Sequence, residues 1–183
     1  MTPSIRTSLL ALAAALGIAA SATPAHAQQA SFTYWQSNGG GCVPTDATVA
    51  QQQYWTVTAA GRVKYKGNGT QPLVLSCPVT SFNPRVVGGD GTVLRLFYQD
   101  PDGVGTAFQV RARLMAFAKS NGALSQVCMV ASDRSGQWQS SSGVCGAINM
   151  DTHLYWVEVV VMRSQPSNLV VEFNGVSLEG AIF

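Results

Sequence analysis

The stretch TAFQVRARLMAFA, from Thr106 to Ala118, decides the fold class. Its apolar side chains recur at every second position, and polar side chains fill the first three positions between them. The two sets are Phe108, Val110, Ala112, Leu114 and Ala116 against Gln109, Arg111 and Arg113. A period of two with this contrast predicts a β-strand that has one face on a core and the other in water.

Short runs of the same kind recur along the chain. They are rich in Val, Thr, Tyr, Phe and Trp and lie between Gly, Pro, Asn and Asp clusters, which is typical of strands separated by turns. The predicted strands are Ser31–Gln36, Gln53–Thr58, Gly61–Lys66, Leu73–Ser76, Thr92–Gln99, Thr106–Ala118, Ser125–Ala131, Val144–Asn149, His153–Met162, Asn168–Phe173 and Val176–Glu179. Asp46–Gln53 is the one plausible helix, and Gly39–Gly41 and Ser140–Gly143 are predicted loops. We therefore predict an all-β protein, an antiparallel two-sheet β-sandwich of jelly-roll type.

Three local patterns predict how the strands connect. Asp100–Gly103 reads Asp-Pro-Asp-Gly, a strong turn signal, so we expect a hairpin between Thr92–Gln99 and Thr106–Ala118. Asn174-Gly175 lies between two predicted strands and predicts a second hairpin. Tyr155–Val161 is apolar on both faces and predicts a central strand.

The N-terminal segment predicts the location of the protein. Arg6 precedes an apolar run from Leu9 to Ala20, and Ala25-His26-Ala27 has the form of a cleavage site. This pattern is typical of a secretory signal peptide. We assign residues 1–27 to the signal peptide and residues 28–183 to a single domain, exported to the periplasm or the extracellular space. No later apolar run has the length of a transmembrane segment, and the net charge of +2 gives no bulk electrostatic reason to bind nucleic acid.

All four cysteines lie after the predicted signal peptide. An even count in an oxidising compartment favours two disulfides, for which three connectivities are possible. We favour Cys42–Cys77 and Cys128–Cys145, because each joins neighbouring segments. There is no C-x-x-C pattern, and His153 is the only histidine after residue 27, so we expect no metal site and no cofactor.

Part of the chain resembles uncharacterised exported bacterial proteins. The shared frame is a Cys-x-Pro near the mature start, followed by a strand that ends in Cys-Pro. Its residues here are Cys42-Val43-Pro44, Tyr54, Gly61-Arg62-Val63 and Leu75-Ser76-Cys77-Pro78-Val79. The resemblance implies a secreted, disulfide-linked β-domain and supports the Cys42–Cys77 pair, but it implies no activity.

Candidates for catalysis are few. Glu158 lies inside an apolar strand and could act with a nearby acid on a polysaccharide, because glycoside hydrolysis uses two carboxylates. The alternative is an outward-facing or paired glutamate. There is no G-x-S-x-G motif, and an even cysteine count argues against a free thiol nucleophile. Asp100 and Asp102 could suggest calcium, but the rest of a calcium loop is missing, so a turn is the better interpretation.

Candidates for binding are Trp138 and a set of arginines. Trp138 lies among small polar residues that cannot bury an indole, in a segment that Cys128–Cys145 would tether. An exposed tryptophan suits a sugar ring or the apolar patch of a partner; alternatively, it folds back onto the sandwich edge. Arg95, Arg111 and Arg113 would share one face of the predicted hairpin and suit an acidic polysaccharide, or form an ordinary solvated face.

These features predict a secreted, non-catalytic binding module. The expected ligand is a glycan or another surface polymer, and the expected alternative partner is another envelope or extracellular protein. A small polysaccharide-active enzyme and a structural cell-envelope protein without a small ligand are the competing hypotheses.

Overall fold

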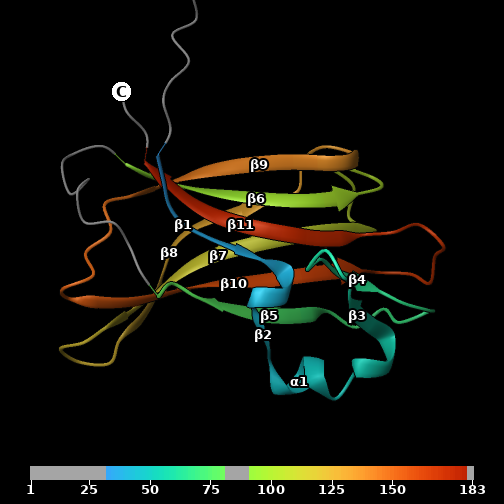
Figure 1. The fold of residues 1–183 in the computed structure, drawn as a ribbon, viewed down its shortest axis with the longest axis horizontal. Coiled ribbons are helices and arrows are strands. Elements are labelled where there is room, and N and C mark those ends of the chain that lie inside the picture. Colours follow the sequence, from blue (N-terminus) through green and yellow to red (C-terminus); the bar gives the residue numbers. More distant parts are fainter. Residues whose placement is uncertain (1–31, 81–90, 181–183) are drawn as a thin grey trace, which may run out of the picture.

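The computed structural model describes residues 32–80 and 91–180. Over these residues the chain forms two antiparallel sheets in two layers, with β9, β6 and β11 in one layer and β7, β10 and β5 in the other (Figure 1). The predicted antiparallel β-sandwich is therefore confirmed. The predicted signal peptide, residues 1–27, lies outside the described residues.

The larger sheet has six strands and the smaller has five. In the six-stranded sheet the order is β3 (Trp55–Val57), β4 (Val63–Tyr65), β11 (Glu172–Gly180), β6 (Thr92–Asp100) and β9 (Gly136–Gly146), and β1 (Phe32–Asn38) also pairs with β11. In the five-stranded sheet the order is β2 (Val43–Pro44), β5 (Leu73–Pro78), β10 (His153–Arg163), β7 (Phe108–Ala118) and β8 (Leu124–Ala131). The helical elements are α1 (Asp46–Val49) and two 3-10 turns, η1 (Gly39–Gly41) and η2 (Gln52–Tyr54).

The core lies between the sheets and is built from the faces that the alternation predicts. All five apolar residues of the Thr106–Ala118 pattern are buried on β7, and Leu94, Leu96 and Tyr98 of β6 are fully buried opposite them. β10 lies between β5 and β7, so the central position predicted for Tyr155–Val161 is confirmed. The side chains inside and outside the sandwich are thus fixed by strand periodicity.

The predicted hairpin across Asp100–Gly103 is wrong. β6 belongs to the six-stranded sheet and β7 to the five-stranded sheet, so the turn carries the chain from one layer to the other. The Asp100 carboxylate shapes this turn, because its Oδ1 accepts hydrogen bonds from the backbone N–H groups of Asp102 and Gly103, both at 3.1 Å. The turn signal was correct, but such a signal does not say in which sheet the next strand lies.

The second predicted hairpin, at Asn174-Gly175, is also wrong. Both residues lie inside β11, where the pairing with β6 shifts register between Phe173 and Gly175. The glycine is needed for close approach rather than for a turn: a Cβ atom on Gly175 would lie 2.8 Å from the carbonyl oxygen of Ser37 on β1. The Asn-Gly pair therefore marks a bulge.

The predicted loop Ser140–Gly143 is in fact the middle of β9, and the strand ends at Gly146 rather than at Asn149. The small residues meet local packing demands. Ser141 points inward and shares a 2.7 Å hydrogen bond with the Tyr98 hydroxyl, and a Cβ atom on Gly143 would lie 3.0 Å from the carbonyl oxygen of Met129 on β8. A serine-rich stretch is typical of a loop, but here the small side chains allow β8 to approach β9 closely.

Both predicted disulfides are present: the first lies beside the β2–β5 pair of the five-stranded sheet, and the second links the two layers. Cys42 follows the turn at the end of β1 and bonds to Cys77 on β5. Cys128 on β8 bonds to Cys145 on β9, which joins the edge strands of the two sheets. Within the described ranges, no helix is both long and apolar enough to cross a bilayer.

Candidate functional site

A groove of about 660 Å³ lies on the six-stranded sheet, on the side that faces away from the core. Its residues come from β1, β6, β9 and β11: Gln36, Ser37, Asn38, Phe97, Trp138, Asn174, Gly175 and Val176. β9 and β1 form opposite walls, because β6 and β11 lie between them in the sheet. The lining combines two aromatic rings with three side-chain amides and contains no ionisable group.

Trp138 forms the β9 wall of the groove. Its side chain is 66% exposed, and the Arg62 guanidinium carbon lies over the indole, 4.2 Å from the ring centroid. The indole is therefore displayed at the surface and does not fold back onto the core. An exposed indole next to polar groups can stack on an apolar ring face while its neighbours form hydrogen bonds.

Phe97 was missed by the sequence analysis. It lies on β6 at an outward position, between the inward residues Leu96 and Tyr98, and is 37% exposed. An aromatic residue on the polar face of an alternating strand is the signal that could have found it. The amides of Gln36, Asn38 and Asn174 had no such signal, because they come together only through the pairing of β1 with β11.

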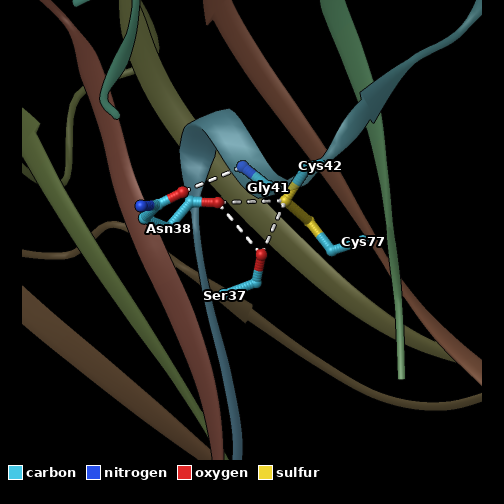
Figure 2. The surroundings of a disulfide bond; sticks show 5 residues. All are labelled: Ser37, Asn38, Gly41, Cys42 and Cys77. Carbon is cyan, nitrogen blue, oxygen red and sulfur yellow. Dashed lines mark hydrogen bonds between the residues drawn. A yellow bond between two sulfur atoms is a disulfide. The ribbon is translucent and has the colours of Figure 1, made fainter. Parts of the chain in front are cut away.

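The β1 wall is held in place by a turn and a disulfide, as Figure 2 shows. The Asn38 side-chain oxygen accepts a hydrogen bond of 2.8 Å from the Gly41 N–H, and the Ser37 hydroxyl lies 3.7 Å from the sulfur of Cys42. Cys42 is in turn bonded to Cys77 on the other sheet. The end of β1 therefore has a fixed position relative to the groove floor.

The structure does not bring the three predicted arginines together. Arg95 lies on the six-stranded sheet, where its Nε is 2.9 Å from the Glu179 carboxylate, whereas Arg111 and Arg113 lie on β7 in the five-stranded sheet. The single arginine face was wrong because the hairpin on which it rested does not form. Arg113 is also paired, with its Nε 3.0 Å from Glu158, so its charge is balanced locally.

Glu158 is an outward-facing, paired glutamate. Directly opposite it across the sheet lie Ser76 on β5 and Arg113 on β7, so neither neighbour supplies a second acid. The Asp102 carboxylate accepts a hydrogen bond from the Ala107 N–H at 3.0 Å, which is a turn-stabilising contact. Within residues 32–80 and 91–180, no three His, Cys, Asp or Glu side chains are arranged to hold a metal ion.

A second surface lies on the outer side of the five-stranded sheet. Phe117 on β7 pairs with Leu154 on β10 and Leu124 on β8, and all three are exposed. The next row along places Met115 against Trp156. Contiguous exposed apolar side chains of this kind are typical of an interaction surface.

Comparison with known proteins adds information on the fold. No protein-family model matches the sequence, and no curated protein matches it either. Among solved structures, the chain matches part of a structure that contains the CBM22-1 and GH10 modules of the Clostridium thermocellum endo-1,4-β-D-xylanase 10B, complexed with xylohexaose. The identity is 11%, the TM-score is 0.50, and the match covers 82% of this chain but only 28% of that one.

Two further matches are single modules. The C-terminal family 22 carbohydrate-binding module of the same xylanase has 12% identity and a TM-score of 0.43, with 82% of this chain and 92% of the other covered. A xylan-binding module from Roseburia intestinalis has 13% identity and a TM-score of 0.38, with 81% and 96% covered. The structural neighbours are mainly carbohydrate-binding modules, and at these identities the likeness concerns the fold alone.

Proposed function

We propose that this protein is an exported, non-catalytic module that binds a glycan in the groove on the six-stranded sheet. The observation that carries the proposal is the composition of the groove: an exposed indole, a half-exposed phenyl ring and three amides on the outer side of one sheet. Aromatic rings stack on the apolar faces of sugars, and amides both donate and accept hydrogen bonds, as hydroxyl groups require. The carbohydrate-binding modules among its structural neighbours are consistent with this proposal.

The test is a thermal-shift screen of the oxidised protein from residue 28, with neutral and acidic polysaccharides and with calcium. A ligand present at 100 times its dissociation constant stabilises the folded state by ~2.7 kcal/mol. At roughly 2–4 °C per kcal/mol for a domain of this size, the expected shift is several degrees. A shift with one glycan class supports the proposal, and no shift with any glycan counts against it.

Trp138→Ala connects the shift to the groove. Because the indole is 66% exposed, we expect the variant to keep its melting temperature without ligand and to lose the ligand-induced shift. Leu154→Ala is the matched control, since Leu154 is an exposed apolar residue on the other sheet. An equal loss of the ligand-induced shift in both variants would show that the shift does not depend specifically on the groove.

A second candidate function rests on the apolar outer face of the five-stranded sheet. Phe117, Leu124 and Leu154 together form a patch suited to another envelope or extracellular protein, or to self-association. Sedimentation velocity over a hundredfold concentration range tests the simplest case. Loss of self-association in Leu154→Asp but not in Val104→Asp, at an exposed position in the turn between β6 and β7, would favour it.

A further inference from the structure

The backbone at Trp138 is unusual for a residue with a side chain. Trp138 is the one non-glycine residue with a positive φ in the part of the chain that the structure describes, at 59°. It lies at a bulge, because Tyr98 pairs with Gln139 whereas Asp100 pairs with Gly136, so β9 has one residue more than β6. Left-handed backbone is unfavourable for residues other than glycine and persists where the surroundings determine it.

The Arg62 guanidinium lies over one face of the Trp138 indole. Arg62 itself lies in the connection between β3 and β4, where its N–H donates to the Thr58 hydroxyl at 3.1 Å and its carbonyl accepts from the Thr58 N–H at 2.8 Å. Its Nη1 lies 3.2 Å from the Glu172 carboxylate. Glu172 is itself buried on β11 and also has Lys64 at 3.8 Å. The backbone of Arg62 and its guanidinium group are therefore each held by contacts that do not involve Trp138.

We propose that Arg62, held by Glu172, is a positioning residue of the groove: it covers one face of the Trp138 indole and holds the other available to the ligand. This inference rests on the proposed function. A guanidinium over an indole is attracted by the ring and also matches its planar shape. The contact restricts the side chain before binding, so less conformational entropy is lost when a sugar stacks on it.

The same arrangement bears on the class of ligand. The guanidinium is already paired with Glu172 and stacked on the indole, and none of the eight groove-lining residues is ionisable. The lining side chains therefore offer no charge to an acidic sugar, and Arg62, the cation over Trp138, shares the Glu172 carboxylate with Lys64. We expect an uncharged glycan, bound with an affinity that added salt leaves unchanged, because screening weakens only interactions between charges.

The test compares two arginines in matched settings. Arg62→Met removes the guanidinium over the indole, and Arg95→Met removes an arginine of similar exposure, 35% against 29%, that is paired with its own buried glutamate, Glu179. Affinity for the glycan found in the screen is measured by calorimetry at low and high salt. Near-UV circular dichroism, after subtraction of the Trp138→Phe spectrum, reports how firmly the Trp138 ring is held.

We expect Arg62→Met to weaken binding roughly two- to fivefold, the effect of one exposed cation–π contact, and to lose the Trp138 circular dichroism band. Arg62→Lys should restore part of both, and Arg95→Met should change neither. A retained band in Arg62→Met would overturn the inference, whatever binds. So would a lost band with unchanged affinity, or wild-type affinity for an acidic glycan that falls with salt. If no glycan binds the wild type, the proposed function fails, and the band alone still decides whether Arg62 positions the indole.

Discussion

Asp100 gives the sharpest prediction about stability. Its side chain is fully buried at the end of β6, with 0% exposure. Oδ1 accepts the two backbone hydrogen bonds of the turn, and Oδ2 accepts one from the Ser132 hydroxyl. Burial penalises the charged carboxylate more than these hydrogen bonds favour it, and the pKa of Asp100 rises from 3.8 to about 6. The folded protein therefore holds a proton there that the unfolded chain releases.

The sign of the pH effect follows from this difference. Between pH ~4 and ~6 the folded state binds more protons than the unfolded state, so the free energy of unfolding falls as the pH rises. The contribution is fully present below the unfolded pKa and lost above the folded one. A shift of about two pKa units corresponds to at most ~3 kcal/mol, or roughly 6–12 °C in melting temperature for a domain of this size.

The assay is urea denaturation of the oxidised protein between pH 4.5 and 8, followed for wild type and Asp100→Asn. The variant cannot ionise, so its free energy of unfolding should lack the fall that the wild type shows in this range. Asp133 does not interfere, because hydrogen bonding from Ser141 lowers its pKa, and its contribution is lost only in more acid solution. Parallel profiles for wild type and Asp100→Asn would refute the reasoning. Asp151→Asn, at an exposed carboxylate, is the control and should follow the wild type.

Three further substitutions test the packing, each by urea denaturation at pH 7. Leu114→Ala should cost about 2–5 kcal/mol, because Leu114 is fully buried between the sheets, and a smaller cost would mean that the core collapses into the space. Gly175→Ala should cost about 1–3 kcal/mol, since its Cβ atom would lie 2.8 Å from the carbonyl oxygen of Ser37; an unchanged stability would show that β1 can move away. Arg163→Met should cost about 3 kcal/mol, because the buried Arg163 side chain donates hydrogen bonds to loop carbonyls; its Nε lies 2.8 Å from the carbonyl oxygen of Gly69. A stability equal to or above that of the wild type would show that water can replace these hydrogen bonds.

The inside and outside of the sandwich could be predicted from the sequence, and the strand partners could not. Alternation along Thr106–Ala118 and Thr92–Gln99 identified the buried faces, because each side chain's environment is encoded within its own strand. Which strands pair is decided by long-range packing. The turns at Asp100–Gly103 and Asn174-Gly175 were therefore assigned to hairpins that the sheets do not contain.

The site was predicted only where a single residue carried the signal. Trp138 stood out because its neighbours are too small and polar to cover it, and the structure places it in the groove. Phe97 and Arg62 come from distant parts of the sequence, and their roles depend on the order of β4, β11, β6 and β9 in the sheet. The opposite error concerns Arg95, Arg111 and Arg113. The outward face of each strand was assigned correctly, but the two faces were joined through a hairpin that does not form.

The disulfides could be predicted from the sequence, whereas the groove whose walls they help to hold could not. The two groove walls are β1 and β9, and β9 is the edge of its sheet. Edge strands have ladder hydrogen bonds on one side only, so they are the strands most free to shift. Cys42–Cys77 bonds the segment between β1 and β2 to β5, beside the β2–β5 pairing, and Cys128–Cys145 bonds β9 to β8 in the opposite layer of the sandwich. The β9 wall is therefore held by a covalent link to the opposite layer as well as by strand pairing, and the turn that follows β1 is anchored to β5. Both links add to the rigidity that a preformed binding groove needs.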